Sequence, residues 1–194
     1  MSGVSSGSWR GHCRTIAALG VVAILVGCGG PEVDPVAVET VDATRAPDHS
    51  EGPPKRLEIP RLDVDATVLA LGKAEDGSQE VPKALDDTGW WRHGSKPGEP
   101  GNTVIVGHTA SKDDGVFDDL GTLRRGDRIA VRTRDGARDY RVTGTEEVAV
   151  ENFASASDSI YRETGPSGLV LLTCGDWNGR DYDTTVIVRA DIVR

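Results

Sequence analysis

From Arg56 to the carboxyl terminus the chain is a series of short apolar segments bounded by Gly or Pro, and this pattern constrains the fold most. The segments are rich in Val, Ile, Leu and Thr, which favour strands. The predicted strands are Leu57–Ile59, Leu62–Val68, Thr103–Gly107, Asp127–Thr133, Tyr140–Val148, Gly168–Thr173 and Thr184–Val193. Asp135-Gly136 is typical of a hairpin turn between two of them. The sequence therefore predicts a mainly β protein.

Helical periodicity is weak, and only short helical turns are expected, around Val116–Leu120 and Asn152–Ser155. Strands at this spacing favour one closed or nearly closed barrel of about eight strands with short helices. A chain of 194 residues with 37% apolar residues buries one core more readily than two. We therefore expect one folded domain over residues 56–194.

The amino terminus has the pattern of an export signal. Arg10 and Arg14 precede an apolar run, Ile16–Val26, that is short for a membrane span of about 20 residues. The residues Leu25-Val26-Gly27-Cys28 resemble a bacterial lipobox, so we expect a lipoprotein-type signal peptide over 1–27 and lipid on Cys28. An uncleaved anchor and an ordinary cleaved signal are the alternatives. All three place the domain outside the cytoplasm, and the lipid would hold it at the outer face of the cell membrane.

Residues 28–55 are predicted to be a flexible tether, because they are rich in Pro, Asp, Glu, Ala and Thr and contain no aromatic residue. The formal charge is −9, and it is −11 without the two arginines of the leader. The chain has no cluster of Lys and Arg such as holds a polyanion, which argues against nucleic-acid binding.

Cysteine usage singles out one residue. Cys13 lies in the leader and Cys28 would carry lipid, so Cys174 is left in the domain without a disulfide partner. A lone thiol in an oxidising compartment indicates a nucleophile, although a buried core cysteine is the alternative. Cys174 follows an apolar run and precedes Gly175-Asp176, which we expect to break the strand and leave the thiol at the sheet edge.

A second strand also ends in a residue with reactive chemistry. The segment Asn102–Val106 has the pattern of a buried strand and is followed by Gly107-His108. A thiol nucleophile needs a positioned basic group, and an imidazole supplies one. A structural histidine is the alternative when His108 is considered alone. Together, the two strand ends predict a Cys/His site.

These two features, Gly107-His108 after a strand and Leu171-Leu172-Thr173-Cys174 about 65 residues later, resemble the sortase family. The order of Pro60, Gly89-Trp90-Trp91, Pro97–Gly101 and Gly126-Asp127 is also similar to that family, over residues 56–194. The likeness is greatest to the actinobacterial sortases of class F. It implies a sortase-like β-barrel.

The resemblance also implies a function. Cys174 would cleave a sorting signal such as Leu-Pro-X-Thr-Gly between Thr and Gly, and would pass the acyl group to an amine. His108 would be the acid and base, and Thr173 would contribute to the substrate and oxyanion site. The implied partners are exported proteins with a sorting signal and an amine acceptor, either a peptidoglycan precursor or a pilin Lys. Hydrolysis would be a side activity.

The arginine that the resemblance leads us to expect is absent from its usual position. Sortases carry an Arg at the start of the last strand, where this chain has Tyr182–Val186, with Asp183 in the place of the cation. Arg180 is the preferred substitute and Arg189 is the alternative. Because of this departure, a lipid-anchored, sortase-like binding module with impaired catalysis is the second hypothesis for the function.

No metal or organic cofactor is expected, because acyl transfer through a thiol needs only a nucleophile, an acid/base and oxyanion donors. The acidic residues Asp113-Asp114 and Asp118-Asp119 lack the alternating spacing of a calcium loop and are interpreted as an acidic surface.

Overall fold

The computed structural model describes residues 52–75, 77, 79–110 and 114–193. The predicted leader, Cys28 and most of the predicted tether lie outside these residues. Within the described part, no helix is long and apolar enough to cross a membrane.

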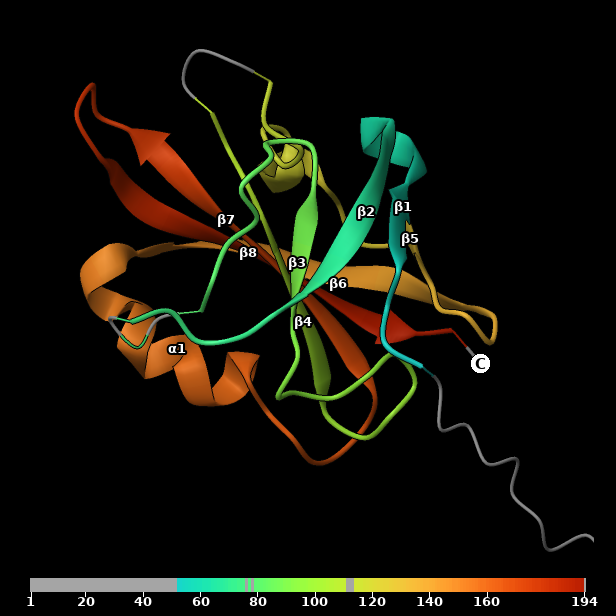
Figure 1. Ribbon diagram of the computed structural model, residues 1–194. Helices are drawn as coiled ribbons and strands as arrows, with labels where there is room; N and C mark the ends of the chain where they lie inside the picture. Colours follow the sequence, from blue (N-terminus) through green and yellow to red (C-terminus); the bar gives the residue numbers. More distant parts are fainter. Residues whose placement is uncertain (1–51, 76, 78, 111–113, 194) are drawn as a thin grey trace, which may run out of the picture. The chain divides into compact units, whose positions relative to one another are not determined.

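Eight strands in the described residues close into a barrel in the order β1-β2-β3-β4-β7-β8-β6-β5 (Figure 1). They are β1 (Arg56–Ile59), β2 (Val64–Leu71), β3 (Thr88–Trp91), β4 (Asn102–Gly107), β5 (Arg128–Arg132), β6 (Ala137–Ala149), β7 (Gly168–Trp177) and β8 (Tyr182–Ile192). The prediction of a mainly β, closed barrel of about eight strands is confirmed. A closed barrel pairs the strand edges that an open sheet would expose.

The helical elements are short. They are the 3-10 helices η1 (Pro60–Leu62), η2 (Leu120–Thr122) and η3 (Val150–Asn152), and the helix α1 (Phe153–Ile160). The two predicted helical turns are present, although α1 runs further than Ser155 and η2 begins only at Leu120. The expected hairpin turn at Asp135-Gly136 joins β5 to β6, which pair antiparallel.

Two predictions about strands were wrong. The strand β3 was not among the predicted strands, and its Trp90 is buried in the core. The strand with Cys174 was expected to break at Gly175-Asp176, but β7 continues to Trp177. Its pairing with β8 carries it through these residues of low strand propensity.

The barrel has apolar residues on both faces in its central strands. One cluster fills the interior and includes Leu169 and Leu171 of β7. A second cluster lies on the outer face, where Val170 and Leu172 of β7 meet Val104 and Val106 of β4, and where Phe153 and Ala156 of α1 pack against them. Side chains of a strand alternate between faces, so both faces of β4 and β7 are buried as far as the helix covers them.

Hydrogen bonds of one buried side chain, Asn102, link the helix α1 to β4. The Asn102 amide donates to the carbonyls of Ser159 and Ile160 at 2.9 and 3.1 Å, and its oxygen accepts from Arg162 Nη2 at 2.8 Å. These bonds satisfy carbonyls at the end of the helix, which have no partner within it. The helix α1, which packs on the outer face, is therefore bonded to β4, the strand that precedes His108.

Candidate active site

Cys174 lies on the outer face of β7, two residues beyond Leu172, which belongs to the cluster that α1 packs against. Alternation along the strand places it on the same face as Val170 and Leu172, which are buried, whereas Cys174 is exposed. The exposure of the thiol follows from this face and from the end of the helical cover. The expectation that the thiol is exposed because the strand stops is thus corrected.

His108 is brought to the thiol by the register of two parallel strands. The strands β4 and β7 pair with Asn102 opposite Gly168 and Val106 opposite Leu172. This register leads the two strands side by side toward Gly107-His108 and Thr173-Cys174, and His108, one residue beyond β4, lines the same cavity as Cys174. Neighbouring strands lie about 4.8 Å apart, so residues so paired are neighbours. The two residues that the sequence placed at strand ends therefore meet at one site.

A cavity of about 260 Å³ opens at this pair. Its floor is made by Val106, Leu172 and neighbouring residues of β4 and β7, and its walls come from α1, the β2–β3 connection and β8. The lining residues are Gln79, Val81, Val106, Gly107, His108, Thr109, Phe153, Tyr161, Leu172, Thr173, Cys174, Tyr182 and Thr185. The site is an apolar groove with a thiol, an imidazole and several hydroxyl groups, which suits an extended peptide.

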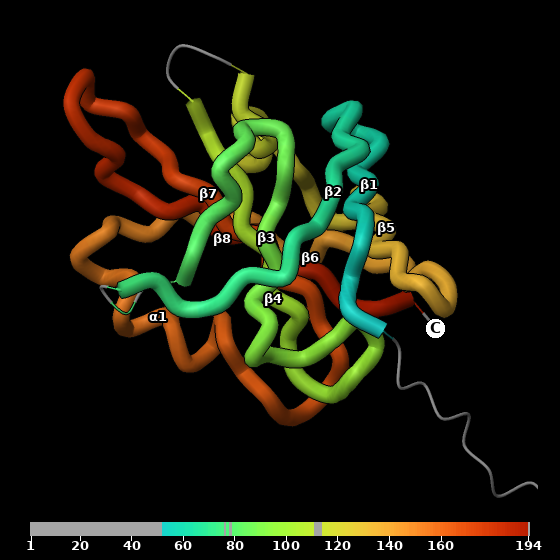
Figure 2. Tube along the Cα trace, viewed as in Figure 1, coloured from blue at the N-terminus to red at the C-terminus, as the bar shows by residue number. Residues whose placement is uncertain are grey.

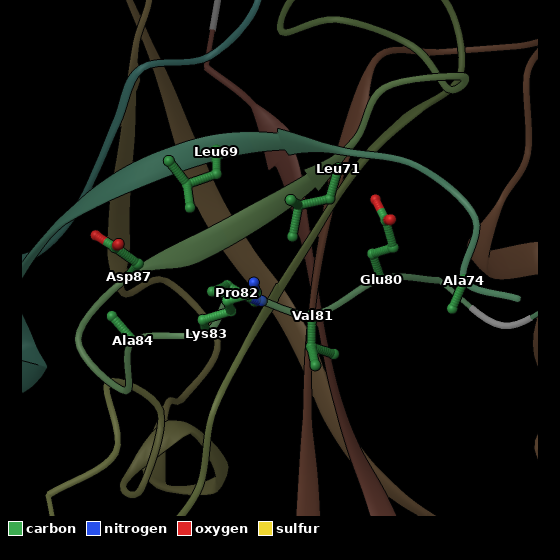
Figure 3. Close-up of a pocket in the computed structure, with 9 residues that line it drawn as sticks. All are labelled: Leu69, Leu71, Ala74, Glu80, Val81, Pro82, Lys83, Ala84 and Asp87. Carbon is green, nitrogen blue, oxygen red and sulfur yellow. The ribbon is translucent and has the colours of Figure 1, made fainter.

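The connection between β2 and β3 forms the wall next to the imidazole. Its Pro82 carbonyl oxygen lies 2.6 Å from His108 Nε2. Figure 3 shows the same connection running beside β2, where Leu69 and Leu71 point toward it and Val81 points away from the strand. Val81 is 56% exposed and lines both this wall and the separate cavity of Figure 3.

Thr173 lies beside Cys174 but its hydroxyl is directed to β4. The Thr173 Oγ1 donates to the Gly107 carbonyl at 2.9 Å and lies 2.9 Å from Thr109 Oγ1. The residue is buried. In this structure the hydroxyl ties β7 to the end of β4, just before His108, and its predicted part in an oxyanion site stays a prediction.

The two arginines proposed from the sequence lie differently. Arg180 is exposed in the loop between β7 and β8, where its backbone N–H donates to Asn178 Oδ1 at 2.9 Å. Arg189 pairs with Glu146 and Ser159 and lines another cavity. Neither lines the cavity of Cys174. Opposite Cys174 on β8 stands Thr185, and Asp183 accepts from Asn178 Nδ2 at 2.7 Å.

The environment of the thiol favours its protonated form. Burial of the thiol against the cavity wall raises the pKa of Cys174, and the negative charge of Asp181 raises this pKa further. Both act against the thiolate, because a thiolate loses hydration and is repelled by a carboxylate. A thiol with a raised pKa becomes a nucleophile only where a base can take its proton, and the imidazole of His108 lines the same cavity.

The acidic surface has a structural role at one residue. The Asp118 carboxylate accepts the backbone N–H groups of Ala110 and Gly115 at 2.8 and 2.9 Å, and so shapes the turn after β4. In the described residues, no group of three or more His, Cys, Asp and Glu side chains is arranged to hold a metal ion.

Several residues around the site were not predicted from the sequence: Gln79, Tyr182 and Thr185 line the cavity, and Pro82 contacts His108. Tyr182 closes the wall on the β8 side, where its hydroxyl donates to the Thr109 carbonyl at 3.0 Å and its ring lies 4.9 Å from that of Trp177. These residues come from loops and from a neighbouring strand, so only the barrel brings them to Cys174.

The fold and the site define a β-barrel in which a cysteine on β7 and a histidine just after β4 line one cavity. Residues 57–193 match the family model described as the sortase domain, which is well over half of the chain. The chain belongs to the sortase family.

Individual relatives are more distant. Sortase A of Bacillus anthracis is 29% identical over 93 residues, which are 48% of this chain and 41% of that protein. The match thus spans less than half of that relative. Sortase C-1 of Streptococcus pneumoniae has a similar structure, with a TM-score of 0.57, 27% identity, and coverage of 72% of this chain and 66% of that chain. The Clostridium perfringens Sortase D5 transpeptidase has a TM-score of 0.57, 20% identity, and coverage of 73% and 79%.

Proposed function

We propose that this chain is a cysteine transpeptidase that cleaves a sorting signal resembling Leu-Pro-X-Thr-Gly and transfers it to an amine. The observation that carries the proposal is that His108 and Cys174, which each lie two residues beyond the paired Val106 and Leu172 of β4 and β7, line one apolar groove. Family membership supports the same reaction. The Gly89-Trp90 and Pro97-Gly98-Glu99 segments support a place in class F.

The reaction proceeds in two halves. His108 takes the thiol proton, and the Cys174 sulfur attacks the carbonyl carbon of the Thr–Gly bond. The tetrahedral adduct collapses to a thioester as the C–N bond breaks, and the proton on His108 passes to the leaving Gly amine. The incoming amine then attacks the thioester, gives its proton to His108 and releases Cys174. Water in place of the amine gives hydrolysis as the side reaction.

The substrate and the location belong to the same proposal. The donor is an exported protein with a sorting signal, and the acceptor is a peptidoglycan precursor or a pilin Lys. Residues 1–27 are the signal peptide and lipid on Cys28 holds the enzyme at the outer membrane face, with residues 28–55 as the tether. The apolar lining of the groove and its hydroxyl groups suit a Leu-Pro-X-Thr segment.

A guanidinium is the third group that the reaction calls for, to stabilise the developing oxyanion. Arg180 is our candidate, because the loop that carries it joins the two strands at Cys174, whereas Arg189 is paired with Glu146. The second candidate function is a sortase-like binding module without turnover. It is favoured by one observation: within the described part of the chain, no Arg side chain lines the cavity of Cys174.

Mass spectrometry of the full chain with a Leu-Pro-X-Thr-Gly peptide, with and without triglycine, tests the proposal. We expect a thioester adduct on Cys174 and a triglycine product, both lost in Cys174→Ala. Arg180→Ala should lower the rate of adduct formation, and Arg189→Ala is the matched control. An intact peptide with every signal variant tried, together with measurable binding, would favour the binding module. Release of the free acid despite triglycine would indicate a hydrolase.

A further inference from the structure

The contact between His108 and the β2–β3 connection assigns the two imidazole nitrogens. His108 Nε2 lies 2.6 Å from the Pro82 carbonyl oxygen, within hydrogen-bond distance. A carbonyl oxygen only accepts hydrogen bonds, so Nε2 must carry the proton in this contact. In the neutral ring Nδ1 is then the unprotonated nitrogen. The bond also persists in the imidazolium, which donates from both nitrogens.

The Pro82 carbonyl is held in place on both sides along the chain. Before it, Glu80 and Gly72 exchange two bonds, from Glu80 N–H to the Gly72 carbonyl at 3.0 Å and from Gly72 N–H to Glu80 Oε2 at 2.7 Å. After it, the Leu85 carbonyl accepts from the Val116 N–H at 2.9 Å. The proline ring fixes φ at its own residue. The acceptor is therefore preorganised, and it does not have to be recruited when a substrate binds.

Nearby contacts tie the same connection to the opposite wall of the groove. Gln79 forms a β-bridge with Lys73, and its Oε1 accepts from the Tyr161 hydroxyl at 3.1 Å, next to α1. Gln79, Val81 and His108 all line the cavity of Cys174. The β2–β3 connection, which contacts the imidazole, is therefore bonded both to the residues just after β2 and to Tyr161 at the end of α1.

We propose that the Pro82 carbonyl is a positioning group that holds His108 in the Nε2–H tautomer, so that Nδ1 exchanges the proton with Cys174 and with the leaving amine. This inference rests on the proposed acyl transfer for its catalytic meaning. Nδ1 takes the proton from the thiol and gives it to the amine, while the Nε2–H bond to Pro82 is kept throughout. A ring held at one nitrogen loses less rotational freedom when it transfers a proton at the other.

The tautomer can be measured without a substrate. In the full chain labelled with ¹⁵N-histidine, at a pH of about 9 where an imidazole is neutral, long-range ¹H–¹⁵N spectra distinguish the protonated from the unprotonated ring nitrogen. The chain has four His residues, and His108→Gln assigns the signal. We expect a protonated Nε2 and an unprotonated Nδ1 at His108. The opposite tautomer, or a rapid mixture of both, overturns the proposal.

The positioning effect can be measured with a backbone change. Replacing Lys83 by its α-hydroxy analogue turns the Pro82 amide carbonyl into an ester carbonyl, which is a weaker acceptor, and leaves all side chains in place. We expect kcat for adduct formation to fall about tenfold, equivalent to about 1.4 kcal/mol, with KM changed less than about twofold. The same replacement at Ala84 weakens the Lys83 carbonyl instead and serves as the matched control.

The outcomes separate the two proposals. If the Lys83 ester and the Ala84 ester react alike, or if the Lys83 ester reacts faster than the unmodified chain, the positioning role is overturned; a faster reaction would mean that Pro82 restrains His108. If the unmodified chain forms no adduct while His108 has the Nε2–H tautomer, the proposed acyl transfer fails and the Pro82 contact stands.

Discussion

Gly107→Ala tests how tightly the end of β4 is packed against the loop that follows it. A Cβ at residue 107 would lie 2.5 and 2.8 Å from ring carbons of Phe117 and 2.8 Å from Val116 Cγ1. These distances are below ordinary van der Waals contact, and Phe117 is fully buried, so its ring has no open space to move into. Overpacking of this kind costs about 1–3 kcal/mol.

The expected loss is about 2 kcal/mol of unfolding free energy. With a urea m-value of about 2 kcal/mol/M for a domain of this size, the urea midpoint should fall by about 1 M. His108 is the next residue and must shift with the backbone, so we also expect adduct formation on Cys174 to slow by tenfold or more.

Gly144→Ala is the matched control, because a Cβ there meets nothing within 4 Å in β6. Urea unfolding of both variants, followed by the mass-spectrometric adduct assay, gives both quantities. Equal midpoints for the two variants would refute the packing argument. A destabilised Gly107→Ala that reacts at the normal rate would refute the link between β4 and the position of His108.

Three further changes test separate parts of the site. Asp181→Asn removes a carboxylate that opposes the thiolate, so the pKa of Cys174 should fall, and the pH profile of alkylation by iodoacetamide should move to lower pH; an unchanged profile would contradict this charge effect. Asn102→Ala removes the amide that donates to the Ser159 and Ile160 carbonyls at the end of α1, and leaves Ser159 only the long bond from Arg189 Nη1 at 3.4 Å; it should lower the unfolding free energy by about 2–4 kcal/mol in urea. Thr173→Val removes the bond to the Gly107 carbonyl and should cost about 1 kcal/mol; a loss of activity beyond tenfold at normal stability would instead support its predicted oxyanion role.

The comparison of prediction and structure is clearest at Cys174. The sequence indicated a nucleophile, because the lone thiol follows an apolar run in a domain that is predicted to be exported. It did not indicate why the thiol is exposed. That exposure depends on where α1 stops covering the outer face of β7, which involves residues about 15–20 positions away in the chain.

The strand content was predictable because β-branched residues and the Gly and Pro boundaries act locally. The strand β3 was missed because it has only four residues, Thr-Gly-Trp-Trp, of which one is Gly, and it is completed by pairing with β2 and β4. The extension of β7 beyond Cys174 has the same origin, since β8 supplies partners for Gly175 and Trp177.

By itself the sequence indicated the mainly β barrel, the two side chains predicted to react and the resemblance to sortases, because these depend on residue type and on order along the chain. Only the tertiary structure decided that His108 and Cys174 line one cavity, that Pro82 contacts the imidazole and that Thr185, not an arginine, faces the thiol across β8. The physical reason is that strand register and loop placement depend on contacts between segments far apart in the chain, and no local pattern of residues records them.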